Sequence, residues 1–122
     1  MRRFLIVMAA VVSALVMNAC EEDKWGYDNR VVFEAYGGEE DVDGDAPVYT
    51  LSIGNHEGDE KEAVEVDGVL TVTYDWLTAT VVKGDDEIRL VAEPNTTGKS
   101  RKLYLYGMVF NNVMDVTVIQ KR

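Results

Sequence analysis

The chain has 122 residues, of which 12 are Lys or Arg and 22 are Asp or Glu, so its formal net charge is −10 at pH 7. This length allows one small domain, and the acidic balance excludes a nucleic-acid backbone as partner, because binding phosphates requires a cationic patch. A single Cys and a single His exclude a disulfide framework and multi-cysteine or His-rich metal centres.

The first residues have the pattern of an export signal. Arg2 and Arg3 precede residues 4–17, in which only Ser13 is polar. A charged start followed by a short apolar stretch is typical of a secretory signal peptide, and the stretch is shorter than the roughly 20 residues of a membrane span. We therefore predict that residues 1–19 are a cleaved signal peptide, with a retained membrane helix as the alternative.

The end of this segment predicts a lipid anchor. Residues 15–20 (LVMNAC) resemble a bacterial lipobox, in which signal peptidase II cuts before a cysteine that then carries lipid, although Met17 and Asn18 depart from the usual pattern. Cys20 is the predicted lipidation site, with an ordinary cut and a free thiol as the alternative. The acids at 21–23 resemble the surface-export signal of Bacteroidetes lipoproteins, which implies an outer-membrane lipoprotein in the periplasm or at the cell surface.

Residues 20–30 have no period and are predicted to be a tether, and from residue 31 onward hydrophobic and polar residues alternate. Short turn-forming segments such as Asp67-Gly68 and Asn111-Asn112 separate the alternating stretches. This pattern predicts an all-β, two-sheet β-sandwich of about seven or eight strands over residues 31–122. The candidate strands are 31–36, 48–53, 63–66, 69–74, 77–82, 87–93, 101–110 and 113–120.

The second half of the chain resembles the BACON domain, the Bacteroidetes-associated, carbohydrate-binding, often N-terminal module. The resemblance covers about 75–122 and is loose over 31–74, where an acidic insertion replaces the usual glycine-rich second strand. It implies an immunoglobulin-like sandwich on an exported protein, with a glycan-binding or spacer role. The residues that carry it are Trp76-Leu77, Ile88-Arg89-Leu90, 95–98 (NTTG), Arg101 and 116–120 (VTVIQ). From the residues alone, Trp76 is predicted to fill the sandwich core.

The most acidic segment is 39–45 (EEDVDGD), whose aspartates alternate as do the first three ligands of a calcium loop. Ala46 and Ser52 stand where such a loop needs a glycine and a bidentate glutamate. We favour a solvated acidic hairpin loop, with a structural calcium ion as the alternative. The residues of that alternative site are Asp41, Asp43 and Asp45. His56 is a weaker metal candidate, because it is the only imidazole.

Exposed aromatic residues are the best candidates for ligand contacts. Tyr104 and Tyr106 lie two residues apart in a predicted strand, and Phe110 lies further along the same side. An aromatic ring covers the flat C–H face of a sugar, so these residues predict a sugar-binding or protein-binding platform. The alternative is that the tyrosines only cover the edge of the sheet or pack beneath the acidic loop.

Catalysis is not expected, because the chain contains no G-x-S-x-G, phosphate loop or H-E-x-x-H motif and Cys20 cannot act as a nucleophile once it is acylated. No cofactor is predicted apart from the alternative calcium ion. We therefore predict a membrane-anchored accessory or binding protein that contacts a glycan or an envelope protein. The alternative is a purely structural surface lipoprotein without a small ligand.

Overall fold

The structure, a computed structural model, describes residues 29–44, 46–109 and 112–122. The predicted signal peptide, Cys20 and most of the tether therefore lie outside the described residues, as do Asp45, Phe110 and Asn111. Within the described ranges the chain forms no helix. These ranges therefore contain no helix long and apolar enough to cross a membrane.

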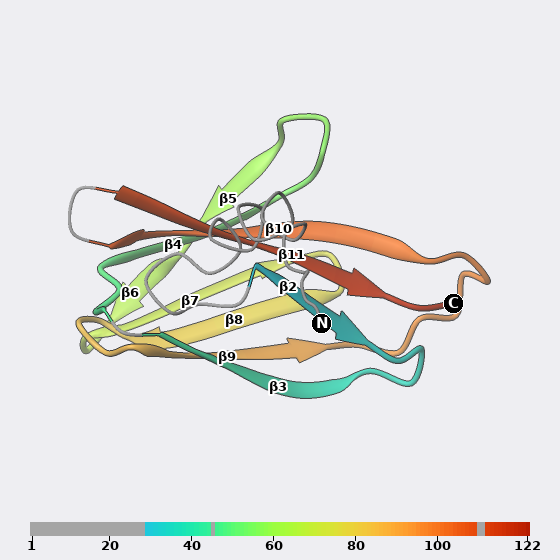
Figure 1. The fold of residues 1–122 in the computed structure, drawn as a ribbon, viewed down its shortest axis with the longest axis horizontal. Coiled ribbons are helices and arrows are strands. Elements are labelled where there is room, and N and C mark those ends of the chain that lie inside the picture. The colour runs from blue at the N-terminus through green and yellow to red at the C-terminus, as the bar shows by residue number, and fades with distance from the viewer. Residues whose placement is uncertain (1–28, 45, 110–111) are drawn as a thin grey trace, which may run out of the picture.

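Ten strands in the described part of the chain form two five-stranded sheets (Figure 1). All paired strands are antiparallel except β2, which runs parallel to the last strand, β11. The first sheet has the order β2 (Arg30–Phe33), β11 (Asn112–Gln120), β10 (Arg101–Val109), β4 (Thr50–Gly54) and β5 (Glu60–Glu62). The second sheet has the order β3 (Gly38–Asp43), β9 (Glu87–Ala92), β8 (Leu77–Val82), β7 (Val69–Tyr74) and β6 (Val64–Val66).

The predicted all-β, two-sheet sandwich is confirmed, and each predicted strand has a counterpart. Two strands were not predicted, β3 and β5, because both consist mainly of charged residues. The interpretation of residues 39–45 as a hairpin loop was wrong for most of its length. Gly38–Asp43 is an edge strand paired with β9, and it places the side chain of Val42, which is 1% exposed, in the core.

The chain passes from one sheet to the other four times: between β2 and β3, β3 and β4, β5 and β6, and β9 and β10. Between β2 and β3 it crosses at residues 34–37, where the amide of Gly37 donates to the carbonyl of Glu34 at 3.0 Å. Gly37 has a φ of 84°, and a Cβ at this position would collide with the carbonyl oxygen of Ala92. The crossing between β5 and β6 takes a single residue, Ala63. At each crossing, two strands that are consecutive in the chain therefore lie in different sheets.

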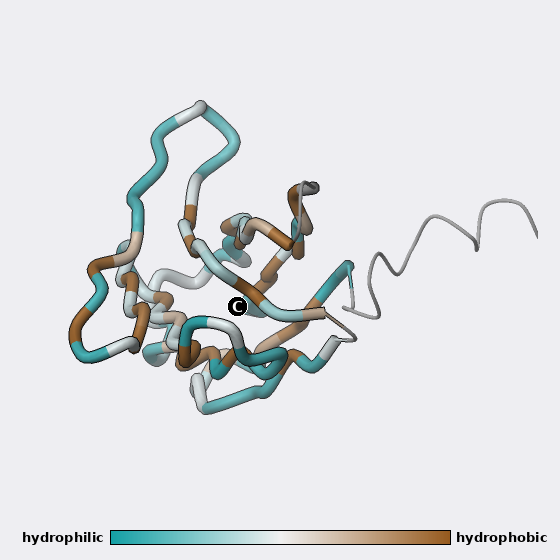
Figure 2. Tube along the Cα trace, turned by 90° about the vertical axis from the view of Figure 1, so that its left-hand side faces the viewer, coloured by the Kyte–Doolittle hydropathy of each residue, from teal (hydrophilic) through white to brown (hydrophobic). Residues whose placement is uncertain are grey.

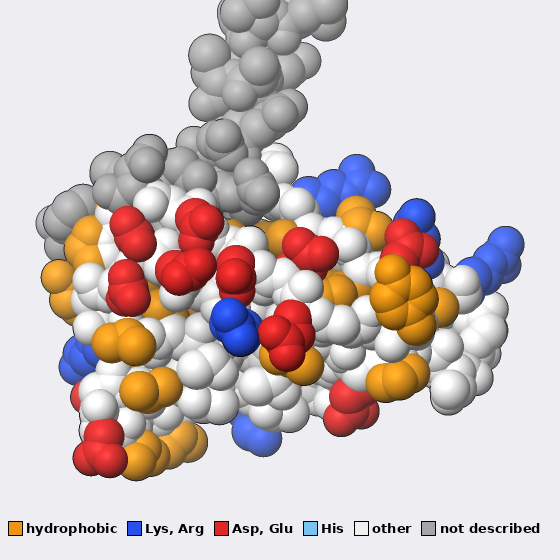
Figure 3. Space-filling model, turned by 90° about the horizontal axis from the view of Figure 1, so that it is seen from below, with side chains coloured by type: hydrophobic (Ala, Val, Ile, Leu, Met, Phe, Trp, Pro, Cys, Tyr) orange, Lys and Arg blue, Asp and Glu red, His pale blue; other side chains and the backbone are white. Residues whose placement is uncertain are grey.

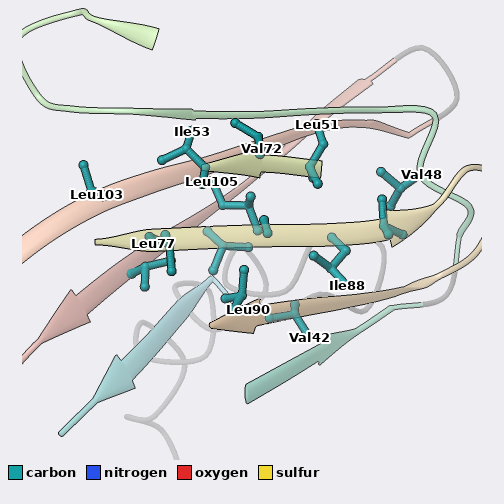
Figure 4. Close-up of a cluster of buried hydrophobic side chains, with 14 of the residues drawn as sticks. Val42, Val48, Leu51, Ile53, Val72, Leu77, Ile88, Leu90, Leu103 and Leu105 are labelled. Atoms are coloured by element: carbon teal, nitrogen blue, oxygen red, sulfur yellow. The ribbon is translucent and has the colours of Figure 1, made fainter. Parts of the chain in front are cut away.

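The core lies between the two sheets and is made by the inward-facing residues of both. Hydrophobic and hydrophilic residues alternate along the strands (Figure 2), as expected for sheets with one buried face. Among the largest fully buried side chains are Ile53, Leu77, Ile88, Leu90 and Leu105, whose side chains gather in the interior (Figure 4). The buried aliphatic contacts provide most of the driving force for folding.

Two tight turns set the strand register, and one of them is the predicted turn at Asp67-Gly68. Asn112, which was predicted to form a turn with Asn111, instead begins β11. Asp67 and Gly68 have φ angles of 53° and 80°, which is the conformation of a two-residue hairpin turn between β6 and β7. Asp75, with a φ of 52°, and Trp76 connect β7 to β8 in the same number of residues. The second turn places Trp76 at one end of the sandwich.

Candidate functional site

The two tyrosines predicted as a platform lie on the outer face of the first sheet. Tyr104 and Tyr106 are half-buried residues of β10, and they alternate with Leu103 and Leu105, which are 3% and 0% exposed and point into the core. Side chains two residues apart on a strand share a face and are roughly 7 Å apart. The predicted assignment of faces is therefore confirmed. The next residue on this outer face is Met108, which is 40% exposed.

Tyr106 packs on the backbone of the neighbouring strand β4. A Cβ placed on Gly54 would lie 3.4 Å from Cε2 of the Tyr106 ring, which is an ordinary van der Waals distance, so the ring lies beside this glycine. Burial raises the pKa of the Tyr106 phenol, and the carboxylates of Asp115 and Glu60 raise that pKa further. The hydroxyl therefore stays protonated at neutral pH and can both donate and accept a hydrogen bond.

A hollow of about 460 Å³ lies on the Tyr106 side of the platform and reaches toward the second sheet; we call it the Tyr106 hollow. Its apolar lining includes Tyr49, Met108 and Val113, which are 46%, 40% and 52% exposed. Its polar lining includes Ser52, whose Oγ donates to Oε2 of Glu60 at 2.6 Å. The hollow therefore combines exposed apolar surface with hydrogen-bonding groups.

A second, wider hollow of about 960 Å³ lies on the Tyr104 side, and we call it the Tyr104 hollow. Asn55, His56 and Asp75 contribute polar side chains to its wall. The Asn55 amide is held in place, because its Nδ2 donates to the hydroxyl of Tyr74 at 2.9 Å. Tyr104 thus lines one hollow and Tyr106 lines the other, and the two hollows have no lining residue in common.

Trp76 lies at the end of the sandwich where the turn between β7 and β8 is located. It is 6% exposed, which confirms the predicted core role. The guanidinium carbon of Arg101 lies 4.9 Å from the centre of the Trp76 ring. The Nε of Arg101 donates to Oε1 of Gln120 at 2.8 Å. The Arg101 Nη2 also donates to the carbonyls of Glu93 and Pro94, at 3.5 and 3.3 Å. Arg101 is thus engaged in holding the fold together.

Gln120 completes this structural cluster. It is 0% exposed, and its Nε2 donates to the carbonyls of Glu34 and Glu93 at 3.1 and 2.7 Å. These bonds join the last strand to the sheet crossing after β2 and to the end of β9. The tryptophan, arginine and glutamine on which the BACON resemblance rests therefore stabilise one end of the sandwich.

The acidic edge strand β3 presents Asp41 and Asp43 to solvent. Arg89 of the neighbouring β9 donates to Asp41 Oδ1 through Nε and to Glu39 Oε1 through Nη1, both at 3.3 Å. The carboxylate of Asp43, and next that of Asp41, raises the pKa of Glu87. Figure 3 shows acidic side chains gathered on the side where β3 lies in Figure 1, with a cationic side chain among them.

The residues of the calcium prediction are only partly described. Asp41 and Asp43 alternate on one face of an extended strand, so they are separated along it and do not wrap around a common centre. Asp45 lies outside the described residues. No group of three or more His, Cys, Asp or Glu side chains that could hold a metal occurs among the described residues. His56 is exposed in the connection after β4. Calcium binding stays a prediction.

Two cations lie near Tyr104; the strand alternation already placed Lys102 on its face, and sequence reasoning missed Arg30. Arg30 pairs with Thr117, and Thr117 pairs with Tyr104, so the three residues form one row across the outer face of the first sheet. Lys102 lies two residues before Tyr104 on the same face. The row depends on the parallel pairing of β2 with β11, which joins residues more than 80 positions apart. No local sequence signal indicates that pairing.

No protein-family model matches this chain, and no curated protein matches it. Among solved structures, the chain is similar to a protein from Bacteroides thetaiotaomicron determined by NMR, with 16% identity and a TM-score of 0.54, over 76% of this chain and 75% of that one. A second similarity is to amylomaltase from Corynebacterium glutamicum, with 12% identity and a TM-score of 0.38, over 88% of this chain and 14% of that one. The first similarity shows that this sandwich fold occurs in a Bacteroides protein.

Proposed function

We propose that this chain is a non-catalytic lipoprotein of the cell envelope whose BACON-like domain binds a glycan through Tyr104 and Tyr106. The observation that carries the proposal is the pair of half-buried tyrosines on one outer face, with an open hollow on each side. Both residues are partly exposed, and each lines one of the two hollows.

Sugar recognition needs apolar contact together with hydrogen bonds. A ring supplies the apolar contact, and partial burial means that little side-chain entropy remains to be lost on binding. Hydrogen-bonding groups lie on both sides of the tyrosines: Asn55 in the Tyr104 hollow and Ser52 in the Tyr106 hollow. An oligosaccharide is favoured over a single sugar, because the outer face of β10 from Lys102 to Met108 extends for about 20 Å.

The proposed location follows from the first twenty residues. A lipid on Cys20 would anchor the protein to the outer membrane, and residues 21–28 would link the anchor to the first described residues. Two or three acyl chains on Cys20 would anchor the protein stably, whereas a single chain gives only reversible membrane binding. Cys20→Ser is expected to move the protein from the membrane fraction to the soluble fraction. An unchanged distribution would contradict the lipid anchor and leave the glycan proposal standing.

Glycan binding can be tested by electrophoresis through gels that contain a panel of plant and host polysaccharides. We expect at least one polysaccharide to retard the wild-type protein, and Tyr104→Ala and Tyr106→Ala to migrate faster in that gel. Tyr36→Ala is the matched control, because Tyr36 is 78% exposed and lies in the connection between β2 and β3. If no polysaccharide retards the protein, the purely structural alternative is favoured. If a polysaccharide retards all three variants as much as the wild type, Tyr104 and Tyr106 are not the binding platform.

A further inference from the structure

We propose, as an extension of the glycan-binding function, that Arg30 and Lys102 form an anion subsite next to Tyr104, and that the preferred ligand is an acidic glycan with carboxylate or sulfate groups. The two cations line one open hollow of about 570 Å³, together with Asn29, Thr117 and Ile119. We call it the Arg30–Lys102 hollow.

The first argument is that neither cation has a side-chain partner among the described residues. The side chains of Lys83, Arg89 and Lys121 make ion pairs with carboxylates at 3.2–3.3 Å, and Arg101 is held by Gln120. Within the described part of the chain, the side chains of Arg30 and Lys102 make no hydrogen bond or ion pair. On a chain with a net charge of −10, two cations that share a hollow and have no partner in the described ranges are a distinctive local feature.

The second argument is the position of the Arg30–Lys102 hollow. Arg30 lies two strands from Tyr104 in the same row, which is about 10 Å between backbones, and Lys102 lies about 7 Å away along β10. Both side chains are long enough to reach toward the Tyr104 ring. A sugar stacked on that ring would therefore extend its acidic substituent toward the two cations. Arginine suits this role, since its guanidinium can donate two parallel hydrogen bonds to a carboxylate or sulfate.

The third argument concerns the negative charges of the protein, which repel an acidic glycan. The net negative charge of the chain repels polyanions, but that repulsion is screened beyond roughly 8–10 Å at physiological ionic strength. Local groups therefore determine where an acidic sugar binds. The carboxylates of Asp115 and Glu60 lie on the Tyr106 side, close enough to raise the pKa of its phenol. The acidic unit of the ligand is thus expected over Tyr104, with neutral units over Tyr106.

The test compares matched pairs of polymers: dextran sulfate with dextran, and polygalacturonate with its methyl ester. Wild-type protein is expected to bind the anionic member of at least one pair more tightly, and the preference should decrease as salt is added. Arg30→Gln and Lys102→Gln should each weaken anionic binding by about tenfold, as expected for the loss of one charge-assisted hydrogen bond. Neutral binding should stay within twofold.

Lys61→Gln and Lys99→Gln are the matched controls, because both remove one exposed cation outside this hollow. All four substitutions are at exposed positions, so unchanged thermal melting will show that the fold is intact. Equal affinity for both members of each pair, or equal losses in the control variants, would overturn the anion subsite and leave glycan binding standing. Absence of binding to every polymer would overturn both proposals.

Discussion

The most informative stability prediction concerns Asn95, in the connection between β9 and β10. Its side chain is 9% exposed and makes four hydrogen bonds. Nδ2 donates to the carbonyls of Lys99 and Lys121 at 2.8 and 2.9 Å, and Oδ1 accepts from the backbone N and the Oγ1 of Thr97 at 3.1 and 2.7 Å. Asn95 therefore links its own turn to the residue that follows the last strand.

Asn95→Ala removes all four bonds. At about 0.5–1 kcal/mol each, with allowance for water reaching the carbonyls of Lys99 and Lys121, the free energy of unfolding should fall by about 2–3 kcal/mol. For a domain of this size the melting temperature should then fall by roughly 10–20 °C. Urea unfolding measures the change directly, and an unchanged m-value would show that the unfolded state is the same.

The control is Thr96→Ala, because Thr96 is exposed in the same turn. We expect it to change the unfolding free energy by less than about 0.5 kcal/mol, as is usual for surface substitutions. If Asn95→Ala cost no more than Thr96→Ala, the role of Asn95 as a link between the turn and the C-terminus would be refuted.

Three further predictions concern Glu87, Leu105 and Gly37. The neighbouring acids raise the pKa of Glu87 in the folded state, so this group weakens the fold as pH rises above the ordinary glutamate range. Glu87→Gln should therefore melt at a higher temperature than wild type at pH 7 and at an equal temperature well below pH 4; a difference that persists in acid would contradict this cause. Leu105→Ala, at a position that is 0% exposed, should lower the unfolding free energy by about 2–5 kcal/mol in urea, and a loss below 1 kcal/mol would mean that the core is not packed as described. Gly37→Ala should destabilise the domain in the same assay, because its φ is 84° and the added Cβ would collide with Ala92; unchanged stability would show that the sheet crossing tolerates another path.

Much of the fold could be predicted because the chain is alternately apolar and polar along most strands. In β9, for example, Ile88, Leu90 and Ala92 are buried and the residues between them are exposed. The edge strand β3 escaped prediction, since one buried side chain, Val42, gives no detectable period among acids. The sheet crossings also carry no period, because they depend on contacts between segments that are distant in sequence.

The candidate site was predictable only within one strand. The outward direction of Tyr104 and Tyr106 follows from the alternation with Leu103 and Leu105. Their neighbours do not follow from it, because Gly54 comes from β4 and Arg30 from β2, which the sheet brings beside β10 by long-range pairing. The BACON resemblance indicated Trp76 and Arg101, and the contacts of Arg101 with the Trp76 ring and with Gln120 show a structural role.

The central claim, that the outer face of the first sheet is the ligand-binding surface, can be tested by mapping amide chemical shifts. The ¹⁵N-labelled protein would be titrated with oligosaccharides from whichever polymer retards it in the gel assay. We predict that the largest shift changes fall on β10 and on its neighbours β4 and β11. Changes confined to the second sheet, on β3 and β9 or on β6 and β7, would contradict the claim.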